Sequence, residues 1–340
     1  MLLPVETATF RLRAYRPSDA AALAEQRSDP TTAEWQDFAL PYPLEKAQEI
    51  VDSPFDGPTP GEWWGLAIAD PATDEYMGSL AIHLAGHSHT AEVGYSLSPA
   101  HRGKGIATAA TRLLVDSLFE RPDIIRVEAS LHPDNIASAM VLERLGFVYE
   151  GTSKNAFWVG DVMSDDPHYA VFRDQWQAWH SRPTAPPTDV QLTEISRPKL
   201  SAVMKLTTHR SQERFVSPVT RSLSEALIPP IEGGVVVTPW YRAVEADGDI
   251  VGFVMLAEPD ATILHPYLWR LLIDRAHQRR SIGRRVLDLI VADRRAEGDK
   301  HMLVSYMPGL GSPEPLYRTY GFVPTGKVDE DGDIEALLKL

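Results

Sequence analysis

The sequence HRGKGIA at residues 101–107 lies between an alternating, strand-like run and a helix-like run. A related sequence, HQRRSIG, fills residues 277–283 in the same setting. A Gly-Phe pair follows each of them, 44 residues after Arg102 and 43 residues after Gln278. With a strand glycine upstream, the markers recur in order at offsets of 174 to 176 residues. A period this long predicts two similar domains rather than a solenoid.

Length and composition fit that organisation. A chain of 340 residues can hold two cores, and 44% apolar with 24% charged residues is ordinary for a globular protein. Three prolines in residues 181–188, without apolar periodicity, indicate a semi-stiff linker. We therefore expect a first domain at 1–180, a linker at 181–189 and a second domain at 190–340. Each is expected to be α/β, with a mixed sheet.

Composition also narrows the class of protein. No apolar run approaches the ~18 residues that span a membrane, and the first residues do not resemble a secretion signal. The absence of cysteine excludes disulfides and thiol catalysis and favours the cytoplasm. A net charge of −14 opposes nucleic-acid binding and attracts cations, polyamines included, although it also serves solubility alone.

The apolar pattern predicts the same order of elements in both halves. In the first half we expect strands at 8–13, 63–69, 76–83, 91–97 and 125–131, and helices from Ser18 or Asp19, over 106–118 and over 136–145. In the second half we expect strands at 190–192, 240–245, 250–257, 267–273 and 302–306, and helices after Pro198, over 282–296 and over 315–320.

This ordered set resembles the GNAT superfamily of N-acetyltransferases, once in each half. The first half is similar to the branch that acetylates the N-termini of ribosomal proteins, through AEVGYSLSP at 91–99, RGKG at 102–105 and LGF at 145–147. The second half is similar to the diamine acetyltransferases, through FVSP, LSEA, LWRL and YGF, which begin at Phe215, Leu223, Leu268 and Tyr320. The resemblance implies acetyl-CoA as co-substrate, a primary amine as acceptor and two GNAT domains in tandem.

The turn before the helix suits the pyrophosphate of coenzyme A. Free N–H groups and the helix dipole favour an anion there, and glycine lets the backbone approach it. In the first half the resemblance implies coenzyme binding by Leu97, Arg102, Gly103, Lys104, Gly105, Ala107 and Asn135. Arg102 and Lys104 would place cations beside the phosphates. The N–H of Leu97 would polarise the thioester carbonyl, and Asn135 would bind the pantetheine arm or cap a helix.

The second half departs from this pattern. Its aligned coenzyme residues are Ile273, Gln278, Ser281 and Gly283. Ser281 stands where the first half has Gly105 and resists a positive φ, although the two preceding arginines could compensate. Leu310 stands at the place of Asn135. Coenzyme binding and a decayed domain kept for packing therefore remain alternatives for this half.

Amine acetylation needs a base, a donor to the thioester oxygen and a proton for the thiolate. Glu92 is the candidate base, unless it is only an exposed strand carboxylate, and Ser138 could donate to the sulfur. The family's tyrosine acid is missing in the first half, where Leu142 occupies its place. It is present in the second half as Tyr317, which could also be a core aromatic.

Other side chains are weaker candidates. Glu225 and Glu258 could hold an ammonium group in the second half or be solvated. Trp35, Trp63 and Trp64 could line an acceptor pocket or pack in the core. The histidines at 83, 87 and 89 have poor spacing for zinc, so we expect no metal.

The leading hypothesis is an acetyl-CoA-dependent N-acetyltransferase. Its acceptor would be a small, cationic primary amine, such as an antibiotic, an amino-acid derivative or a polyamine. The alternatives are acetylation of a protein N-terminus, activity in both halves on different amines, and a non-catalytic acyl-CoA-binding or scaffold protein. We expect no nucleic-acid or membrane partner. A homodimer is left open.

Overall fold

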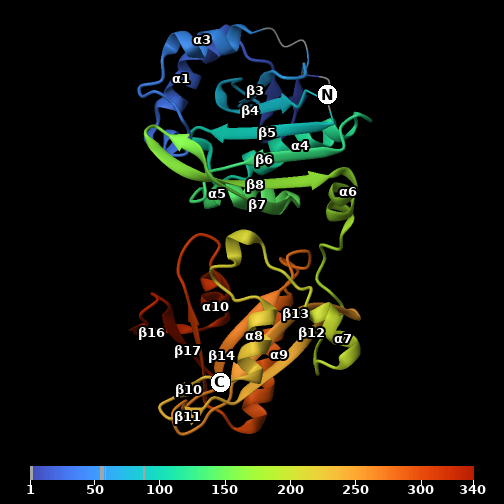
Figure 1. Ribbon diagram of the computed structural model, residues 1–340, viewed down its shortest axis with the longest axis vertical. Helices are drawn as coiled ribbons and strands as arrows, with labels where there is room; N and C mark the ends of the chain where they lie inside the picture. The colour runs from blue at the N-terminus through green and yellow to red at the C-terminus, as the bar shows by residue number, and fades with distance from the viewer. Residues whose placement is uncertain (1–2, 54–56, 58, 87–88) are drawn as a thin grey trace. The chain divides into compact units, whose positions relative to one another are not determined.

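A computed structural model describes residues 3–53, 57, 59–86 and 89–340. The chain forms two compact units, unit 1 over Met1–Ser181 and unit 2 over Arg182–Leu340 (Figure 1). Each unit has a mixed β-sheet with helices on both faces, which confirms the predicted fold class. In the described part of the chain, no helix has the length and apolar character needed to cross a membrane.

Unit 1 is built on eight strands in the order β1-β2-β3-β4-β5-β6-β8-β7. The neighbours β5 and β6 are parallel, with helix α4 in the connection between them, and the other pairs are antiparallel. The strands are β1 Val5–Glu6, β2 Arg11–Arg13, β3 Trp63–Ala69, β4 Tyr76–Leu84, β5 Thr90–Leu97, β6 Arg126–Ser130, β7 Val148–Val159 and β8 Val162–Phe172. The helices are α1 Ala20–Ser28, α2 Pro30–Ala33, α3 Leu44–Asp52, α4 Ile106–Phe119, α5 Ile136–Leu145 and α6 Arg173–Ser181.

Helices cover both faces of this sheet. Successive side chains of a strand point to opposite faces. On β3, Ala67 packs with Leu23 and Val51 of helices α1 and α3. Its neighbour Leu66 belongs to the larger cluster that includes Leu114 of α4. The two clusters are therefore the two sides of one three-layer unit.

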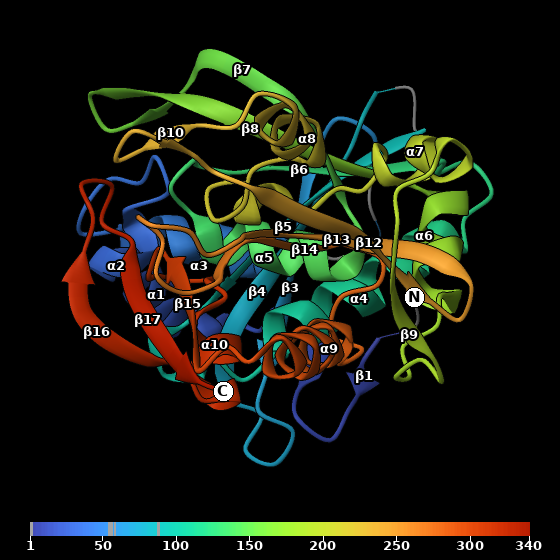
Figure 2. The same cartoon turned by 90° about the horizontal axis from the view of Figure 1, so that it is seen from below.

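Unit 2 has seven strands in the order β16-β17-β15-β14-β13-β12-β9, with a separate β10–β11 pair. Its strands are β9 Val190–Thr193, β10 Ile231–Glu232, β11 Val235–Val236, β12 Pro239–Ala246, β13 Asp249–Ala257, β14 Tyr267–Ile273, β15 His301–Tyr306, β16 Val323–Val328 and β17 Ile334–Lys339. Its helices are α7 Arg197–Val203, α8 Val219–Leu227, α9 Ile282–Glu297 and α10 Glu314–Tyr320. Figure 2 shows α8 and α9 on opposite sides of the central strands, and two separate clusters of buried residues agree with this.

Gly78 on β4 and Gly252 on β13 hold the same place in their two sheets. Each pairs with the last residue of the central strand of its unit. A Cβ on Gly78 would overlap the carbonyl oxygen of Ser96, and one on Gly252 would lie 2.6 Å from the carbonyl oxygen of Leu272. Only glycine therefore fits at these two positions, which explains why they mark the repeat.

The proline-rich segment is attached to unit 2. The side chain of Arg280 donates to the carbonyl oxygen of Ala185 (2.9 Å), and that of Arg285 donates to those of Pro187 (2.5 Å) and Thr188 (3.0 Å). The Asp247 carboxylate accepts from the N–H of Thr188 (2.9 Å). The segment that the sequence predicted as a linker is therefore bound by side chains from two places in unit 2. These are the turn between β12 and β13 and the start of helix α9.

Asp19 holds the N-cap position of the first helix, as predicted, but its side chain does not make a capping bond. Helix α1 begins at Ala20, after a short 3-10 turn, and the Asp19 side chain does not cap it. The Asp19 carboxylate instead receives two bonds from the buried guanidinium of Arg13 (2.6 and 3.0 Å) and one from the N–H of Arg16 (2.9 Å). A buried arginine next to the helix start therefore takes the carboxylate from its capping role.

Candidate active site

Strands β5 and β6 separate after three residue pairs. The parallel pairing runs from Thr90 with Arg126 to Glu92 with Glu128, yet β5 continues to Leu97. Among the strands that the structure describes, the last five residues of β5 have no partner on that side. An opening therefore lies between the strands beyond Glu92, and unpaired backbone groups of β5 face it.

The N–H of Leu97 points into this opening. Backbone N–H groups alternate in direction along a strand. The N–H of Ser98 donates to the carbonyl oxygen of Met77 on β4 (2.9 Å), so that of Leu97 faces away from β4. Unit 2 repeats the arrangement, because the N–H of Asp274 donates to β13 (2.8 Å) and leaves that of Ile273 facing outward. Both units thus offer a backbone donor at the same place.

The turn after β5 leads into the helix with a left-handed backbone. Gly103 and Gly105 have φ values of +74° and +78°, and α4 begins at the next residue, Ile106. No described atom lies within 4 Å of a Cβ built on either glycine. The backbone conformation, rather than crowding by the protein, therefore favours glycine here. The space in front of the helix N-terminus is open to an anion.

Unit 2 keeps this backbone without its glycines. Arg279 and Ser281, which align with Gly103 and Gly105, have φ values of +64° and +61°. Ser281 therefore adopts a positive φ, although its side chain disfavours that conformation. Holding two side-chain-bearing residues in the left-handed region costs about 1–2 kcal/mol each.

We expect Ser281→Gly to stabilise unit 2 by about 0.5–1 kcal/mol, since glycine removes this strain at a smaller entropic cost in the unfolded chain. Hydrogen exchange of amides in α9 and β15 reports the stability of unit 2 within the whole chain. Ser201→Gly, at an exposed position of helix α7, is the matched control and should lower stability by about 0.5 kcal/mol. Equal destabilisation by both changes would contradict the prediction.

Arg102 and Gln278 anchor the ends of the central strands. The Arg102 Nε donates to the carbonyl oxygen of Leu97 (3.0 Å), and its two Nη atoms donate to the hydroxyls of Thr31 (2.7 Å) and Thr32 (2.6 Å). The Gln278 Nε2 donates to the last carbonyl oxygen of β14 (3.0 Å). Arginine in unit 1 and glutamine in unit 2 therefore both bind the last carbonyl oxygen of the central strand, which explains why the two residues align.

The cations of the turn differ from expectation. The Arg102 guanidinium faces the strand end and the threonines rather than the space in front of α4. The exposed Lys104 ammonium donates to the carbonyl oxygen of Ala100 (2.9 Å). In unit 2, Arg280 is only 7% exposed, and its side chain donates to the carbonyl oxygen of Ala185. The predicted electrostatic compensation by Arg280 is therefore not available at that turn.

A cavity of about 320 Å³ lies at the opening of unit 1. Its lining comes from α1, the segment after α2, strands β3 to β6, the start of α5 and the β7–β8 hairpin. It includes Gln26, Arg27, Trp35, Phe38, Trp63, Glu92, Tyr95, Ser96, Ser130, His132, Asn135, Ser138, Phe157 and Asp166. This volume suits a small organic molecule.

Glu92 is a half-buried carboxylate at the closed end of the opening. Burial raises its pKa above the ordinary value, and the nearby Glu128 carboxylate raises it further. His83 and His168 act in the opposite direction, and Asp166 adds to the rise. A carboxylate in these surroundings holds a proton more readily than a solvated one, as a general base requires.

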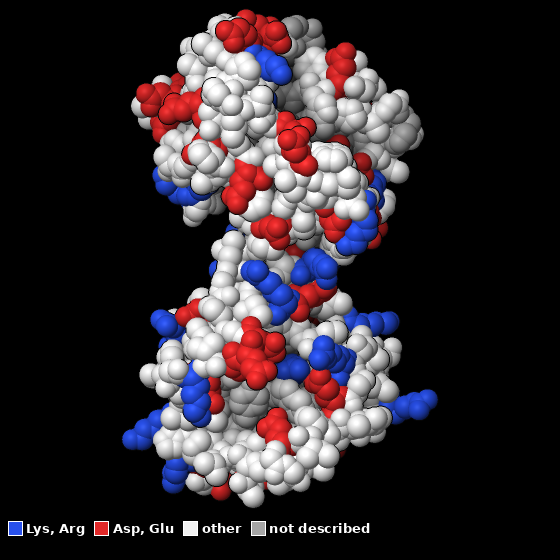
Figure 3. Space-filling model, turned by 60° about the vertical axis from the view of Figure 1, so that its left-hand side comes forward, with Lys and Arg blue, Asp and Glu red and all other residues white. Residues whose placement is uncertain are grey.

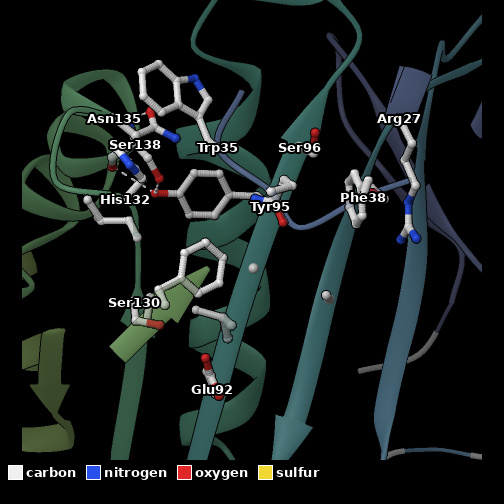
Figure 4. Close-up of a pocket in the computed structure, with 18 of the residues that line it drawn as sticks. Arg27, Trp35, Phe38, Glu92, Tyr95, Ser96, Ser130, His132, Asn135 and Ser138 are labelled. Atoms are coloured by element: carbon white, nitrogen blue, oxygen red, sulfur yellow. Dashed lines mark hydrogen bonds between the residues drawn. The ribbon is translucent and has the colours of Figure 1, made fainter. Parts of the chain in front are cut away.

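Tyr95, which the sequence did not single out, shares this cavity with Ser138. The Ser138 Oγ donates to the Tyr95 hydroxyl (2.9 Å), which donates to the Ser138 carbonyl oxygen (2.8 Å). Figure 4 shows the Tyr95 ring pointing from β5 toward Ser138 and Asn135. Asn135 caps α5 by accepting the N–H of Ser138 (3.1 Å). The only sequence signal for Tyr95 was its position two residues before Leu97.

Of the other aromatic candidates, two line the cavity and one packs in the core. Trp35 and Trp63 line the cavity, with ring centroids 5.2 Å from His132 and 5.1 Å from His83. Trp64 packs against the core instead. His87 lies outside the described residues. Among the described residues, no group of three or more histidine or acidic side chains is placed to hold a metal ion.

Nearly all the net charge of the chain belongs to unit 1. Residues 1–181 carry 26 acidic against 13 basic side chains, a net charge of −13, which leaves −1 for unit 2. On the face drawn in Figure 3, acidic side chains predominate on unit 1, whereas both signs mix on unit 2. The field around the cavity therefore favours the approach of cations.

Comparison with known sequence families agrees with this geometry. A family described as "Acetyltransferase (GNAT) domain" matches residues 9–148, and a second family with the same description matches residues 238–324. Together the two matches cover more than half of the chain. The chain belongs to the GNAT acetyltransferases.

Several curated proteins resemble parts of this GNAT chain. "Probable N-acetyltransferase YjcK" of Bacillus subtilis is 35% identical over 112 residues, 32% of this chain and 62% of that protein. The "Ribosomal-protein-serine acetyltransferase" of Escherichia coli is 32% identical, covering 30% and 57%. The "Spermidine N(1)-acetyltransferase" of Escherichia coli is 26% identical, covering 32% and 59%. The chain thus spans less than two thirds of the length of each of these three relatives.

Unit 2 has no carboxylate at the position that Glu92 holds in unit 1, and no asparagine at that of Asn135. Glu92 pairs with His83, the fifth residue after Gly78 of β4. In unit 2 the fifth residue after Gly252 is Ala257, and it pairs with Tyr267. A register shift between Met255 and Leu256 produces this one-residue offset. Leu310, at the place of Asn135, is 54% exposed and lies outside any helix.

The remaining candidates of the second GNAT domain have structural partners. The Glu225 carboxylate binds Arg270 (3.1 Å) and Arg221, and that of Glu258 binds Arg294 (2.8 Å). These ion pairs differ from the suggested role as ammonium partners. Tyr317 is 6% exposed and stacks on Tyr306, as a core aromatic does, and burial raises its pKa. Gly283 lies inside α9, where a Cβ would contact Leu316.

Proposed function

We propose that unit 1 is an acetyl-CoA-dependent N-acetyltransferase for the primary amine of a small molecule. One observation carries the proposal. A single cavity, at the opening between β5 and β6, is lined both by Glu92 and by the hydroxyl pair of Tyr95 and Ser138. These are groups of the kind that amine acetylation needs, within a family of acetyltransferases.

Coenzyme A fits the first unit at the turn before α4. The left-handed glycines at 103 and 105 leave open space at a helix N-terminus, which favours the pyrophosphate. The N–H of Leu97 would donate to the oxygen of the thioester as it gains negative charge. Acetyl-CoA supplies the activated acetyl group, and Arg102 holds the strand end that carries the Leu97 donor.

Glu92 would remove the proton from the acceptor ammonium, directly or through a water molecule. The amine must be neutral to attack a carbonyl carbon, and Glu92 lines the cavity that would hold the amine. The negative field of unit 1 would raise the local concentration of ammonium ions.

The hydroxyls of Ser138 and Tyr95 would serve the departing thiolate. The family resemblance implies a position for Ser138 beside the sulfur, and its hydroxyl is bonded to that of Tyr95. Burial raises the pKa of Tyr95, which keeps that hydroxyl protonated. Tyr95 would thus position the Ser138 hydroxyl and return a proton to it, in place of the tyrosine that Leu142 replaces.

Tyr95→Phe should lower kcat about 10- to 100-fold and leave the Kd of acetyl-CoA within about twofold, since it removes one hydroxyl but keeps the ring. Ser138→Ala should have a similar effect, and the double variant should be little worse than either, because the hydroxyls act as a pair. Steady-state kinetics and calorimetry measure both quantities. Additive losses would show that the two hydroxyls act independently.

We infer that unit 2 has no turnover of its own. Its acidic candidates are paired with arginines, its tyrosine is buried, and it has no carboxylate at the place of Glu92. Binding of coenzyme by unit 2 is a separate matter, because the left-handed turn and the Ile273 N–H are retained.

The test of the proposed function is CoA release by the whole chain with a panel of amines. Small aromatic amines, amino acids, polyamines and peptides with free N-termini distinguish the acceptor classes. A peptide acceptor is the second candidate, because a ribosomal-protein-serine acetyltransferase is 32% identical over 102 residues. Binding of acetyl-CoA without release for any amine would favour the third reading, a non-catalytic acyl-CoA-binding protein.

A further inference from the structure

Arg27 of helix α1 occupies the side of the cavity opposite Ser138 (Figure 4). Its guanidinium lies over the rings of Phe38 and Tyr42, 4.8 and 4.9 Å from their centroids. The Nη1 atom also donates to the Tyr42 hydroxyl (2.7 Å). Two aromatic faces and one hydrogen bond therefore hold this cation in place at the cavity wall.

Arg27 has no anionic partner among the residues that the structure describes. In that part of the chain, the Tyr42 hydroxyl is the acceptor for one of its five N–H groups, and no carboxylate forms an ion pair with it. The other partly buried arginines of unit 1 bind carboxylates or, for one of them, two carbonyl oxygens; they are Arg11, Arg13, Arg121, Arg126 and Arg173. Arg27 differs from all of these by facing a cavity.

A fixed guanidinium with donors left over is suited to binding an anion. Its planar donors match a carboxylate or a phosphate, and such charge-assisted bonds are stronger than neutral ones. The aromatic faces hold the cation without neutralising it. Because the geometry exists before a ligand arrives, little conformational entropy is lost on binding.

The rest of the cavity lining carries two carboxylates and several aromatic rings. The carboxylates of Glu92 and Asp166 belong to the lining, on strands β5 and β8. Trp35, Trp63 and Phe157 contribute ring surface between the groups. A ligand that satisfies all of these groups has an ammonium, an apolar body and an anion.

Resting on the function proposed for unit 1, we propose that Arg27 is the anion subsite of its acceptor pocket. The acceptor is then a primary amine on an aromatic body that also carries a carboxylate or a phosphate. The sequence alone favoured a cationic acceptor and gave no sign of an anion subsite. The negative field of unit 1 still draws in the ammonium end, while Arg27 selects among amines.

Matched ligand pairs test this subsite by calorimetry, whether or not they are turned over. Phenylalanine and phenethylamine differ by the carboxylate, and tyramine phosphate and tyramine differ by the phosphate. The whole chain should bind at least one anionic member about 10- to 100-fold more tightly than its partner. Whichever pair shows the difference identifies the anion. Equal or weaker binding of both anionic members overturns the proposal.

Arg27→Gln should remove this preference. It should leave the binding of phenethylamine, tyramine and acetyl-CoA unchanged. Arg112→Gln, on the exposed face of α4, is the matched loss of a positive charge and should keep the preference. A preference that survives in Arg27→Gln overturns the subsite, and so does a loss of acetyl-CoA binding in that variant. Failure of the proposed function looks different, because the unchanged chain then releases no CoA with any amine.

Discussion

Replacing Gly105 with tryptophan is expected to weaken acetyl-CoA binding by unit 1 at least about 100-fold, about 2.7 kcal/mol. The residue has a φ of +78°, and a Cβ built on it faces open space. A tryptophan would therefore fill the region in front of α4 and disfavour the left-handed turn at the same time. Calorimetric titration of acetyl-CoA into the whole chain measures the loss.

Ser281→Trp is the matched variant in unit 2, because Ser281 has the same backbone conformation at the same helix position. Gly283→Trp is less suitable, since its Cβ would already contact Leu316 of helix α10. If only Gly105→Trp removes binding, the coenzyme belongs to unit 1 alone. Two sites, each removed by one variant, would show that unit 2 also binds coenzyme. Unchanged binding in Gly105→Trp would contradict the proposed coenzyme site.

Glu92→Gln is expected to lower kcat about 10²- to 10⁴-fold, the range for loss of a general base. Glutamine keeps the shape of the side chain but cannot take a proton. The Kd of acetyl-CoA should stay within about twofold, because the proposed role of Glu92 concerns the acceptor. Steady-state kinetics with the best amine of the panel, together with calorimetry, measure the two effects.

The pH profile gives an independent check on Glu92. The base must be unprotonated, so kcat/KM should fall as the pH falls through its pKa. Burial and Glu128 raise that pKa, which places the acid limb above pH 4.5, the ordinary value for glutamic acid. Glu92→Gln should lose this limb. Glu128→Gln should move the limb to lower pH, since it removes a neighbouring negative charge. A limb that persists unchanged in Glu92→Gln would assign the base to another group.

The sequence predicted the architecture well because the buried parts of both sheets have regular apolar patterns. The strands around Gly78 and Gly252, the helices after the two turns and the Asn135 cap all appear where expected. The β7–β8 hairpin was not predicted, since many of its residues are exposed and its apolar residues do not alternate regularly with polar ones. Short peripheral helices such as α3 also lacked a clear signal.

Side-chain roles were harder to predict than backbone roles. The motif placed Arg102 beside phosphates, but its guanidinium reaches the strand end and two threonines that are 71 and 70 residues away in sequence. Tyr95 gave no signal beyond its position before Leu97, because its partner Ser138 is 43 residues away. Arg27 reaches the cavity through the fold alone. Such contacts depend on tertiary packing, which a local pattern does not report.

The left-handed turn at the start of α9 has a consequence for how duplicated domains change over time. Arg279 and Ser281 hold a conformation that glycine adopts freely, although unit 2 has no glycine there. The flanking strand and helix therefore suffice to hold the turn, so a duplicated domain can exchange these glycines and keep the backbone angle. A search for degenerate copies of this domain should then look for two residues of positive φ ahead of a helix, and not for a pair of glycines.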